Sequence, residues 1–497
     1  MDDVYNLEVI SPNRHGGIIL HISSLPSKYG IGTFGKSAYE FADFLKKAGI
    51  KYWQVLPLGP TSYGDSPYQS FSSFAGNPYF IDLEMLQEDG YLKEEELDLD
   101  FGDDPRHVDY HKIYTHRFQV LKKAFHRYRE KNPGDIEARG PYIEEYAAYM
   151  TIKKTQDNKA WNLWEDSLKD PHSEEVKKQL DIHQEEYQFH LFCQKIFFEQ
   201  YFKLKEYVNG QGIQIIGDLP IYVAEDSADL WAHQEDFLME KNHPSVVGGC
   251  PPDGFSEDGQ LWGNPIYNWN RLKEKDYEFF HERMLCNLDL FDILRIDHFR
   301  GLESYWEIPY GSKTAATGHW VKGPGVDLFR RFEEKYGKAN IIAEDLGYIT
   351  EEVIEFREAT GFFGMKVMQF AFNPEGESDY LPHNCTRNWV MYTGTHDNET
   401  LKSWVEKAPK KEVEFAKKYL KISQEEGMVW GIIRGAWSSV CDIAIAQIQD
   451  FLEIGDEGRM NAPSTLGNWT FRVKREELTD ELAEKIHDLN KLYGRIR

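Results

Sequence analysis

Phe291-Asp292-Ile293-Leu294-Arg295-Ile296-Asp297 is a short, mostly apolar run that ends in charged side chains. A run of this length, bounded by polar residues, is typical of a buried strand. Side chains alternate between the two faces of a strand, so Arg295 and Asp297 share one face while Leu294 and Ile296 share the other. The stretch therefore predicts a strand that delivers a charged pair at its carboxyl end.

Seven other runs of this kind occur along the chain, and helical patterns separate several of them. One such pattern predicts an amphipathic helix over 34–48, with Gly49 at its C-cap. Strands that alternate with helices form parallel sheets, and eight such units close into a (β/α)8 barrel with its active site at the carboxyl ends of the strands. An open doubly wound sheet is the alternative. The seven runs are 17–23, 52–58, 213–219, 341–345, 365–370, 389–393 and 442–448.

The spacing of the runs is uneven, which indicates inserted segments on the loops of one barrel spanning 1–497. We expect a mainly helical inserted subdomain over 66–205. A second inserted subdomain is expected over 225–290, with an active-site loop at 247–264 that is rich in glycine, proline and aromatic residues. About 50 residues follow the last run, so we expect no separate C-terminal β-domain.

The charge balance limits the partners. The 57 Lys and Arg residues face 83 Asp and Glu residues, for a formal net charge of −26. Nucleic acid and anionic membrane both require a basic surface, so neither is expected as a partner. Aromatic residues make up 14% of the chain, and their flat rings suit sugar faces as well as ordinary cores.

The five cysteines predict neither a zinc site nor a disulfide framework. They are odd in number and lie at least 36 residues apart. The chain also lacks an apolar run of about 18 residues and an N-terminal signal pattern. We therefore expect a cytoplasmic protein with no metal and no cofactor; the sequence does not specify its oligomeric state.

Three acids follow three of the predicted strands: Asp297, Glu344 and Asp397. Retaining cleavage of a glycosidic bond needs a carboxylate nucleophile and a carboxylic acid roughly 5 to 5.5 Å apart, a distance that adjacent barrel strands can supply. Arg295 favours the ionised form of Asp297, whereas burial and the two neighbouring negative charges raise the pKa of Glu344. Asp397 is then expected to bind sugar hydroxyls and to favour the oxocarbenium-like ring.

Each of these residues also has a purely structural interpretation. Arg295 and Asp297 can form an ion pair without catalytic function, and Glu344 with the next residue can form a solvated loop. Asp397 or Asn398 can cap a helix over 399–405. His298 and His396 can hydrogen-bond sugar hydroxyls or serve as core histidines. The joint placement of three acids at three strand ends favours the catalytic interpretation.

The strand-end segments resemble those of the α-amylase superfamily. Three match its strand-four, strand-five and strand-seven segments, and a fourth is similar to its strand-three segment in the amylomaltase form. They are Arg295-Ile296-Asp297-His298-Phe299-Arg300-Gly301, Ala343-Glu344-Asp345-Leu346-Gly347, Thr395-His396-Asp397-Asn398 and Gly217-Asp218-Leu219-Pro220-Ile221-Tyr222.

Other segments resemble the 4-α-glucanotransferases (amylomaltase or disproportionating enzyme) more narrowly, in order from residue 21 to about residue 463. These segments are His21-Ile22-Ser23-Ser24-Leu25-Pro26, Tyr29-Gly30-Ile31-Gly32, Trp53-Gln54-Val55-Leu56-Pro57-Leu58-Gly59-Pro60, Tyr63-Gly64-Asp65-Ser66-Pro67-Tyr68-Gln69, Pro251-Pro252-Asp253, Gly259-Gln260-Leu261-Trp262-Gly263-Asn264-Pro265 and Arg459-Met460-Asn461. One departure is Gly254, where an aromatic or aliphatic side chain is expected in some relatives.

This resemblance implies a fold, a reaction and a set of residues. It implies Asp297 as nucleophile, Glu344 as general acid and then base, and Asp397 as the residue that stabilises the transition state. The implied substrates are α-1,4-glucans and maltooligosaccharides of starch or glycogen, with glucose as an acceptor. The implied substrate contacts are Tyr63, Ser66, Tyr68, Asp218, Asp253, Gln260, Trp262, Arg295, His396 and Asn461.

Transfer and hydrolysis share the covalent glucosyl intermediate on Asp297, so the outcome depends on whether a sugar hydroxyl or water reaches it. Aromatic platforms at Tyr63, Tyr68 and Trp262 can hold an acceptor and exclude water, which favours transfer. An amylase-type α-glucan hydrolase is the alternative. The complete set of three acids argues against a third possibility, a sugar-binding protein without catalysis.

Overall fold

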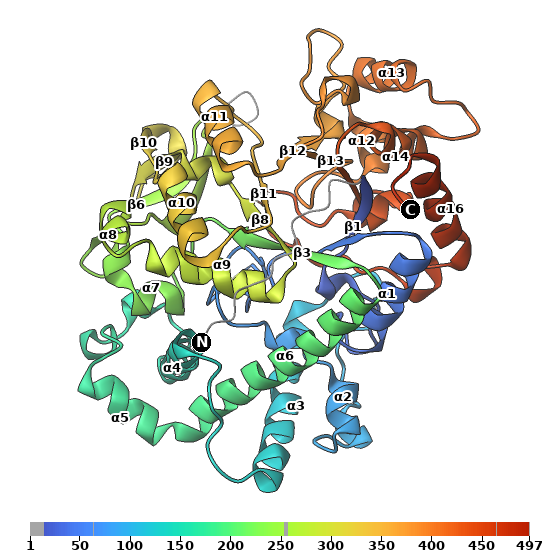
Figure 1. Cartoon of the computed structure of the whole chain (residues 1–497). Coiled ribbons are helices and arrows are strands. Elements are labelled where there is room, and N and C mark those ends of the chain that lie inside the picture. The colour runs from blue at the N-terminus through green and yellow to red at the C-terminus, as the bar shows by residue number, and fades with distance from the viewer. Residues whose placement is uncertain (1–13, 63, 253–256, 464, 497) are drawn as a thin grey trace.

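Eight parallel strands form the centre of the molecule (Figure 1). The computed structural model describes residues 14–62, 64–252, 257–463 and 465–496. The strand order in the sheet is β11-β8-β3-β2-β1-β14-β13-β12. The strands are β1 (His15–Ile19), β2 (Tyr52–Gln54), β3 (Gln214–Pro220), β8 (Ile293–Asp297), β11 (Ile341–Ala343), β12 (Gly364–Val367), β13 (Trp389–Tyr392) and β14 (Ile443–Gln447).

The sheet closes on itself, as expected of a (β/α)8 barrel. The two strands at the ends of the order, β11 and β12, meet through a parallel bridge between Ile342 and Phe363. The amide N–H of Ala343 also donates to the carbonyl oxygen of Phe363 at 2.7 Å. All eight expected strands are confirmed, each within a few residues of its expected bounds.

Alternation along the strands separates an inner from an outer apolar layer. On β8, Ile293 lies in the inner layer, whereas Leu294 and Ile296 pack in the larger cluster between strands and helices. Arg295 and Asp297 therefore share the inner face with Ile293. The inner layer consists of Ile19, Tyr52, Ile216, Ile293, Ile342, Met365, Val367, Val390, Tyr392, Ile443 and Ile445.

Helices surround most of the barrel. The expected first helix is confirmed as α1 (Lys36–Lys47), and Gly49 follows it with a φ of 68°, the left-handed conformation that favours glycine after a helix. Residues 368–388, between β12 and β13, contain two 3-10 turns and no α-helix. The other helices are α2 (Leu83–Glu88), α3 (Tyr110–Lys131), α4 (Pro141–Thr155), α5 (Glu174–Ile182), α6 (Gln184–Gly210), α7 (Ala228–Ala232), α8 (Trp269–Glu274), α9 (Glu278–Leu290), α10 (Val326–Tyr336), α11 (Glu351–Thr360), α12 (Leu401–Lys407), α13 (Lys410–Tyr419), α14 (Met428–Ser438), α15 (Ile448–Phe451) and α16 (Asp480–Leu492).

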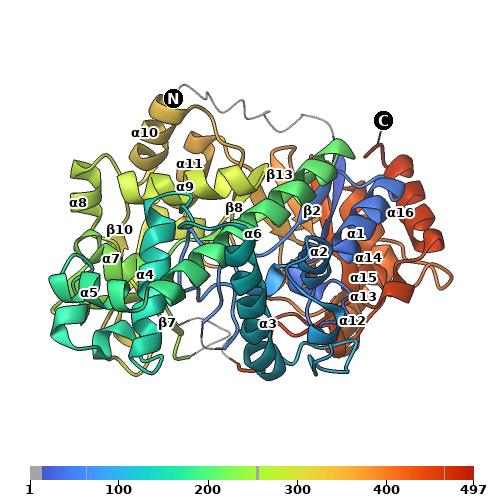
Figure 2. The same cartoon turned by 90° about the horizontal axis from the view of Figure 1, so that it is seen from below.

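The long segment between β2 and β3 holds helices α2 to α6 (Figure 2). Its last helix, α6, also reaches the barrel, since the ring of Tyr207 lies 4.9 Å from that of Tyr39 on α1. Helix α6 thus joins the inserted segment to the outer helical layer. We retain the expected subdomain over 66–205 as a proposal.

A second sheet lies on the loops beside β8. Its antiparallel order is β10-β9-β6-β7, built from β6 (Val246–Cys250), β7 (Gln260–Pro265), β9 (Ser304–Pro309) and β10 (His319–Lys322). The segment 247–264, expected as a loop, contains most of the β6 and β7 hairpin. Because β9 and β10 follow β8, this sheet joins segments that precede and follow that strand in the chain. The expected second inserted subdomain over 225–290 therefore stays a proposal. A short ribbon of β4 (Met239–Glu240) and β5 (His243–Pro244) precedes it.

Beyond β14, the chain forms α15 and then α16, which packs beside α1. In the described ranges, none of the helices combines the length and the apolar character that a membrane span requires.

Candidate active site

Strand β8 ends in a buried ion-pair chain. The guanidinium of Arg295 donates to Asp218 Oδ2 at 2.6 Å and to Asp297 Oδ1 at 2.9 Å. Asp218, on β3, is fully buried and Arg295 is 3% exposed, whereas the Asp297 side chain is 28% exposed. Burial opposes the charge of Arg295, but the two carboxylates keep its pKa well above the ordinary value. Asp297 is therefore the member of this chain that faces the solvent.

Glu344 follows β11, and backbone groups hold both of its carboxyl oxygens. Oε2 accepts from the N–H of His298 at 2.7 Å and Oε1 accepts from the N–H of Leu346 at 2.9 Å. His298 has a φ of 52°, a left-handed conformation that is uncommon outside glycine and is found at functional sites. This turn directly follows Asp297, so it ties the end of β8 to Glu344.

Burial is the main cause that raises the pKa of Glu344 above its ordinary value. The charge of Arg295 opposes the rise, and the negative charge of Asp297 adds to it. A carboxyl group with a raised pKa keeps a proton nearer to neutral pH, which a general acid requires. The expected contribution of Asp397 to this rise is not among its causes.

Asp397 lies in the loop after β13, and its side chain is 43% exposed. Its Oδ1 accepts from the side-chain amide of Asn461 at 2.6 Å, and its Oδ2 lies 3.3 Å from His396 Nε2. Helix α12 begins at Leu401 with Thr400 as its N-cap, so neither Asp397 nor its neighbour caps it. The carboxylate therefore remains available to a ligand.

Tyr68 connects the two sides of the site. Its hydroxyl donates to Asp218 Oδ2 at 2.7 Å and lies 3.4 Å from His396 Nδ1. Its ring also stacks on that of His396 with centroids 4.9 Å apart. A continuous path of side-chain contacts thus runs from Asp297 through Arg295, Asp218, Tyr68 and His396 to Asp397. Because Glu344 binds the residue after Asp297, the structure brings all three predicted acids to one end of the barrel.

The remaining expected contacts divide into three groups. Trp262, on β7, reaches the site: its ring lies edge-on to that of His298 at 4.7 Å, and its Nε1–H donates to Gln260 at 3.0 Å. The Ser66 hydroxyl accepts from the N–H of Tyr68 at 3.2 Å and so shapes the turn that presents Tyr68. Tyr63 and Asp253 lie outside the described residues.

Three further residues make contacts in the site that the sequence analysis did not predict. Trp469 packs its ring against both Tyr68 and His396, at 5.7 and 5.9 Å between centroids. Arg459 donates to the carbonyl oxygen of Asp397 at 3.2 Å. His298, considered only as a helper, supplies its backbone N–H to the acid. No periodicity in the sequence indicates these contacts, because each depends on segments far apart in the chain.

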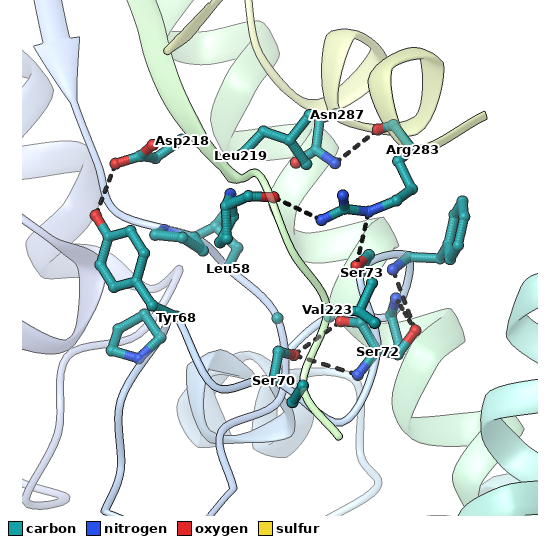
Figure 3. A pocket seen from close by; sticks show the side chains of 18 of the residues that line it. Leu58, Tyr68, Ser70, Ser72, Ser73, Asp218, Leu219, Val223, Arg283 and Asn287 are labelled. Carbon is teal, nitrogen blue, oxygen red and sulfur yellow. Dashed lines mark hydrogen bonds between the residues drawn. The ribbon is translucent and has the colours of Figure 1, made fainter. Parts of the chain in front are cut away.

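Tyr68 and Asp218 also line a small cavity (Figure 3). Arg283 of α9 lines it and donates to the carbonyl oxygens of Pro220 and Ile221 at 2.7 and 2.8 Å. The cavity has a volume of about 40 Å³, which suits a few water molecules and not a sugar ring. The hydrogen bonds of Arg283 therefore stabilise the end of β3. Across the described ranges, His, Cys, Asp and Glu residues form no group of three or more that could hold a metal ion.

A (β/α)8 barrel that gathers an arginine-paired aspartate, a protonatable glutamate and a third, ligand-accessible aspartate defines an enzyme that breaks and re-forms glycosidic bonds. A family model described as 4-alpha-glucanotransferase matches residues 20–479. The chain belongs to this family and is an enzyme of the 4-α-glucanotransferase type.

Individual relatives agree with this assignment. The 4-alpha-glucanotransferase of Clostridium butyricum is 51% identical over 96% of this chain and 100% of its own length. That of Thermus thermophilus is 44% identical over 95% and 97%. Among solved structures, an amylomaltase from Streptococcus agalactiae in complex with acarbose is 39% identical with a TM-score of 0.92, over 97% of this chain and all of that one.

Proposed function

We propose that the enzyme transfers α-1,4-glucan segments from a maltooligosaccharide donor to the 4-hydroxyl of glucose or of another maltooligosaccharide. The path of contacts from Asp297 to Asp397, with Glu344 bound beside it, is the observation that carries this proposal. Family membership supports the reaction class. We further propose that the enzyme acts in the cytoplasm on starch- or glycogen-derived glucans, and that it requires neither cofactor nor metal.

In the first half-reaction, Asp297 attacks the anomeric carbon of the donor. Only its Oδ1 accepts a hydrogen bond within the described part of the chain, so Oδ2 is the attacking atom. As the new C1–O bond forms, the glycosidic bond breaks, and Glu344 gives its proton to the departing O4. The raised pKa of Glu344 supports this role.

In the second half-reaction, the 4-hydroxyl of an acceptor attacks the glucosyl-Asp297 intermediate. Glu344, now ionised, takes the hydroxyl proton while the bond to Asp297 breaks. The donor segment is then joined to the acceptor with the anomeric configuration retained and Glu344 protonated again. Since the same residue serves both steps, the leaving group and the acceptor occupy the same side of the cleft.

The other site residues orient these groups and stabilise the charged ring. Asp397 is positioned by Asn461 and His396 to accept hydrogen bonds from sugar hydroxyls as the oxocarbenium-like ring develops. Asp218 is fully buried, so its proposed role is to orient Arg295 and Tyr68 instead of touching the sugar. Trp262 and Tyr68 offer apolar rings beside the acids that can hold an acceptor and exclude water.

The products formed from maltotriose test this proposal. Transfer predicts glucose together with a ladder of longer maltooligosaccharides, at an almost constant number of reducing ends. Chromatography of the products combined with a reducing-end assay measures both quantities. A steady rise in reducing ends without longer products would establish hydrolysis, the alternative activity, in place of transfer.

A further inference from the structure

Two exposed aromatic rings lie close together outside the site described above. Trp320, on β10, is 37% exposed, and Tyr348, in the loop between β11 and α11, is 67% exposed. Their ring centroids are 6.3 Å apart and their planes differ by 21°. The two rings thus stack on each other, and the largely exposed ring of Tyr348 offers an apolar surface to the solvent that suits the face of a sugar ring.

Two neighbouring side chains pack against the Trp320 ring. The guanidinium of Arg300 lies 3.9 Å from its centroid, and Trp306 contacts it edge-on at 5.1 Å. Arg300 is 4% exposed, and its Nε and Nη1 have no hydrogen-bond partner within the described ranges. Buried donors without a partner are unfavourable. The cation–π contact with Trp320 is a favourable interaction that helps to keep the Arg300 side chain in place. Trp320 is therefore held by its neighbours although part of it faces the solvent.

The residues of this aromatic cluster lie close to the catalytic groups along the chain. Tyr348 is four residues beyond Glu344, and the intervening Leu346 donates its N–H to the Glu344 carboxylate. Arg300 is three residues beyond Asp297. Figure 1 shows β9 and β10 beside α11, the helix that follows the Tyr348 loop. The loop that carries Tyr348 therefore lies close to Glu344.

We propose that Trp320 and Tyr348 form a stacking site for the glucose units of a long acceptor, beyond the unit that receives the transferred segment. The proposal rests on the proposed function, because it takes Glu344 as the residue that contacts the leaving oxygen and the acceptor hydroxyl. We expect an uncharged glucan as the occupant, because the loop that carries Tyr348 lies close to Glu344, the residue that contacts the acceptor. A free glucose acceptor fills only the unit beside Glu344, so we expect it not to contact the pair.

Replacement of Tyr348 by alanine tests this site. With an unlabelled donor at fixed concentration, the KM for radiolabelled maltoheptaose as acceptor should rise about three- to tenfold, the effect of losing one aromatic contact. The KM for radiolabelled glucose and both kcat values should stay unchanged. Tyr348→Phe keeps the ring and should behave as wild type, and Trp320→Ala should reproduce the effect of Tyr348→Ala.

Tyr114→Ala, which removes an exposed ring on α3, serves as the matched control and should change neither KM. Equal KM values for maltoheptaose in wild type and Tyr348→Ala would overturn the stacking site, as would equal rises for both acceptors. A wild-type dimer that Tyr348→Ala converts to a monomer in gel filtration would also overturn it, by assigning the rings to contact between two copies. Failure of the wild type to elongate any acceptor would instead contradict the proposed function.

Discussion

The three acids differ in the groups that hold them, and this difference matches their proposed roles. The guanidinium of Arg295 donates a hydrogen bond to Asp297. Backbone N–H groups hold Glu344 where burial and the charge of Asp297 favour its proton. Asp397 is held by a neutral amide and a histidine, and it keeps the most exposure of the three. The three surroundings thus suit the three different functions proposed for these carboxyl groups.

Replacement of Glu344 by glutamine should lower the transfer rate by about 10²- to 10⁴-fold, because the amide cannot deliver or take up the proton. The amide is nearly isosteric, so the melting temperature should change by only a few degrees as one backbone N–H loses its acceptor. Initial rates with maltotriose and thermal unfolding followed by circular dichroism measure the two effects. Glu351→Gln, an exposed change at the start of α11, is the control. A rate within tenfold of wild type would remove Glu344 as the acid.

At the scale of elements, a buried aspartate anchors the loop that carries Asp397. Asp450 of α15 accepts from the hydroxyl of Thr393 at 2.6 Å and from the N–H of Leu401 at 2.7 Å. These two residues flank the loop between β13 and α12. Burial raises the pKa of Asp450 to about 7, although both hydrogen bonds oppose the rise. The loop that carries Asp397 is thus held by a buried carboxyl group whose pKa is raised toward neutral pH.

Asp450→Asn should flatten the dependence of stability on pH. Between about pH 4 and 7 the folded state keeps a proton on Asp450 that the unfolded chain releases, so the free energy of unfolding falls as pH rises through this window. The effect is on the order of a few kcal/mol. Asparagine is neutral at every pH in this range. The melting temperature of the Asp450→Asn variant should therefore fall less than that of wild type between pH 5 and 7.

Thermal unfolding at one scan rate and several pH values measures this difference. Asp488→Asn, which changes an exposed carboxyl group on α16, is the control and should follow the wild-type profile. Parallel profiles for wild type and Asp450→Asn would show that Asp450 is ionised throughout the range.

For the whole molecule, the net charge of −26 has consequences for stability but not for the proposed substrate. Repulsion between like charges destabilises the compact state, and salt screens it. A neutral glucan is neither attracted nor repelled by this charge. Stability should therefore depend on ionic strength, whereas substrate binding should not.

Raising sodium chloride from about 0.05 to 0.5 M should increase the melting temperature by a few degrees while kcat/KM for maltotriose changes by less than about twofold. Parallel thermal unfolding and initial-rate measurements in the same buffers provide the comparison. A tenfold fall in kcat/KM at unchanged stability would indicate a charged substrate or a charged step in binding.

The sequence by itself determined the eight strands, the first helix and the identity of the three acids. These features are local: a short apolar run and a two-residue alternation place Arg295 and Asp297 on the same face of a strand whatever surrounds them. Long matching segments also indicated the family. Burial along β8 and the closed strand order agree with this local pattern.

Only the tertiary structure decided what each side chain touches. Asp218, expected to contact substrate, is fully buried and binds Arg295 and Tyr68, and the expected loop at 247–264 contains most of the β6 and β7 hairpin. The partners of Asp397 and Tyr68 include Asn461 and Trp469, which are distant in the chain. Local patterns carry no information on such pairs, because closure of the barrel brings together residues whose separation in sequence is unrelated to their distance in space.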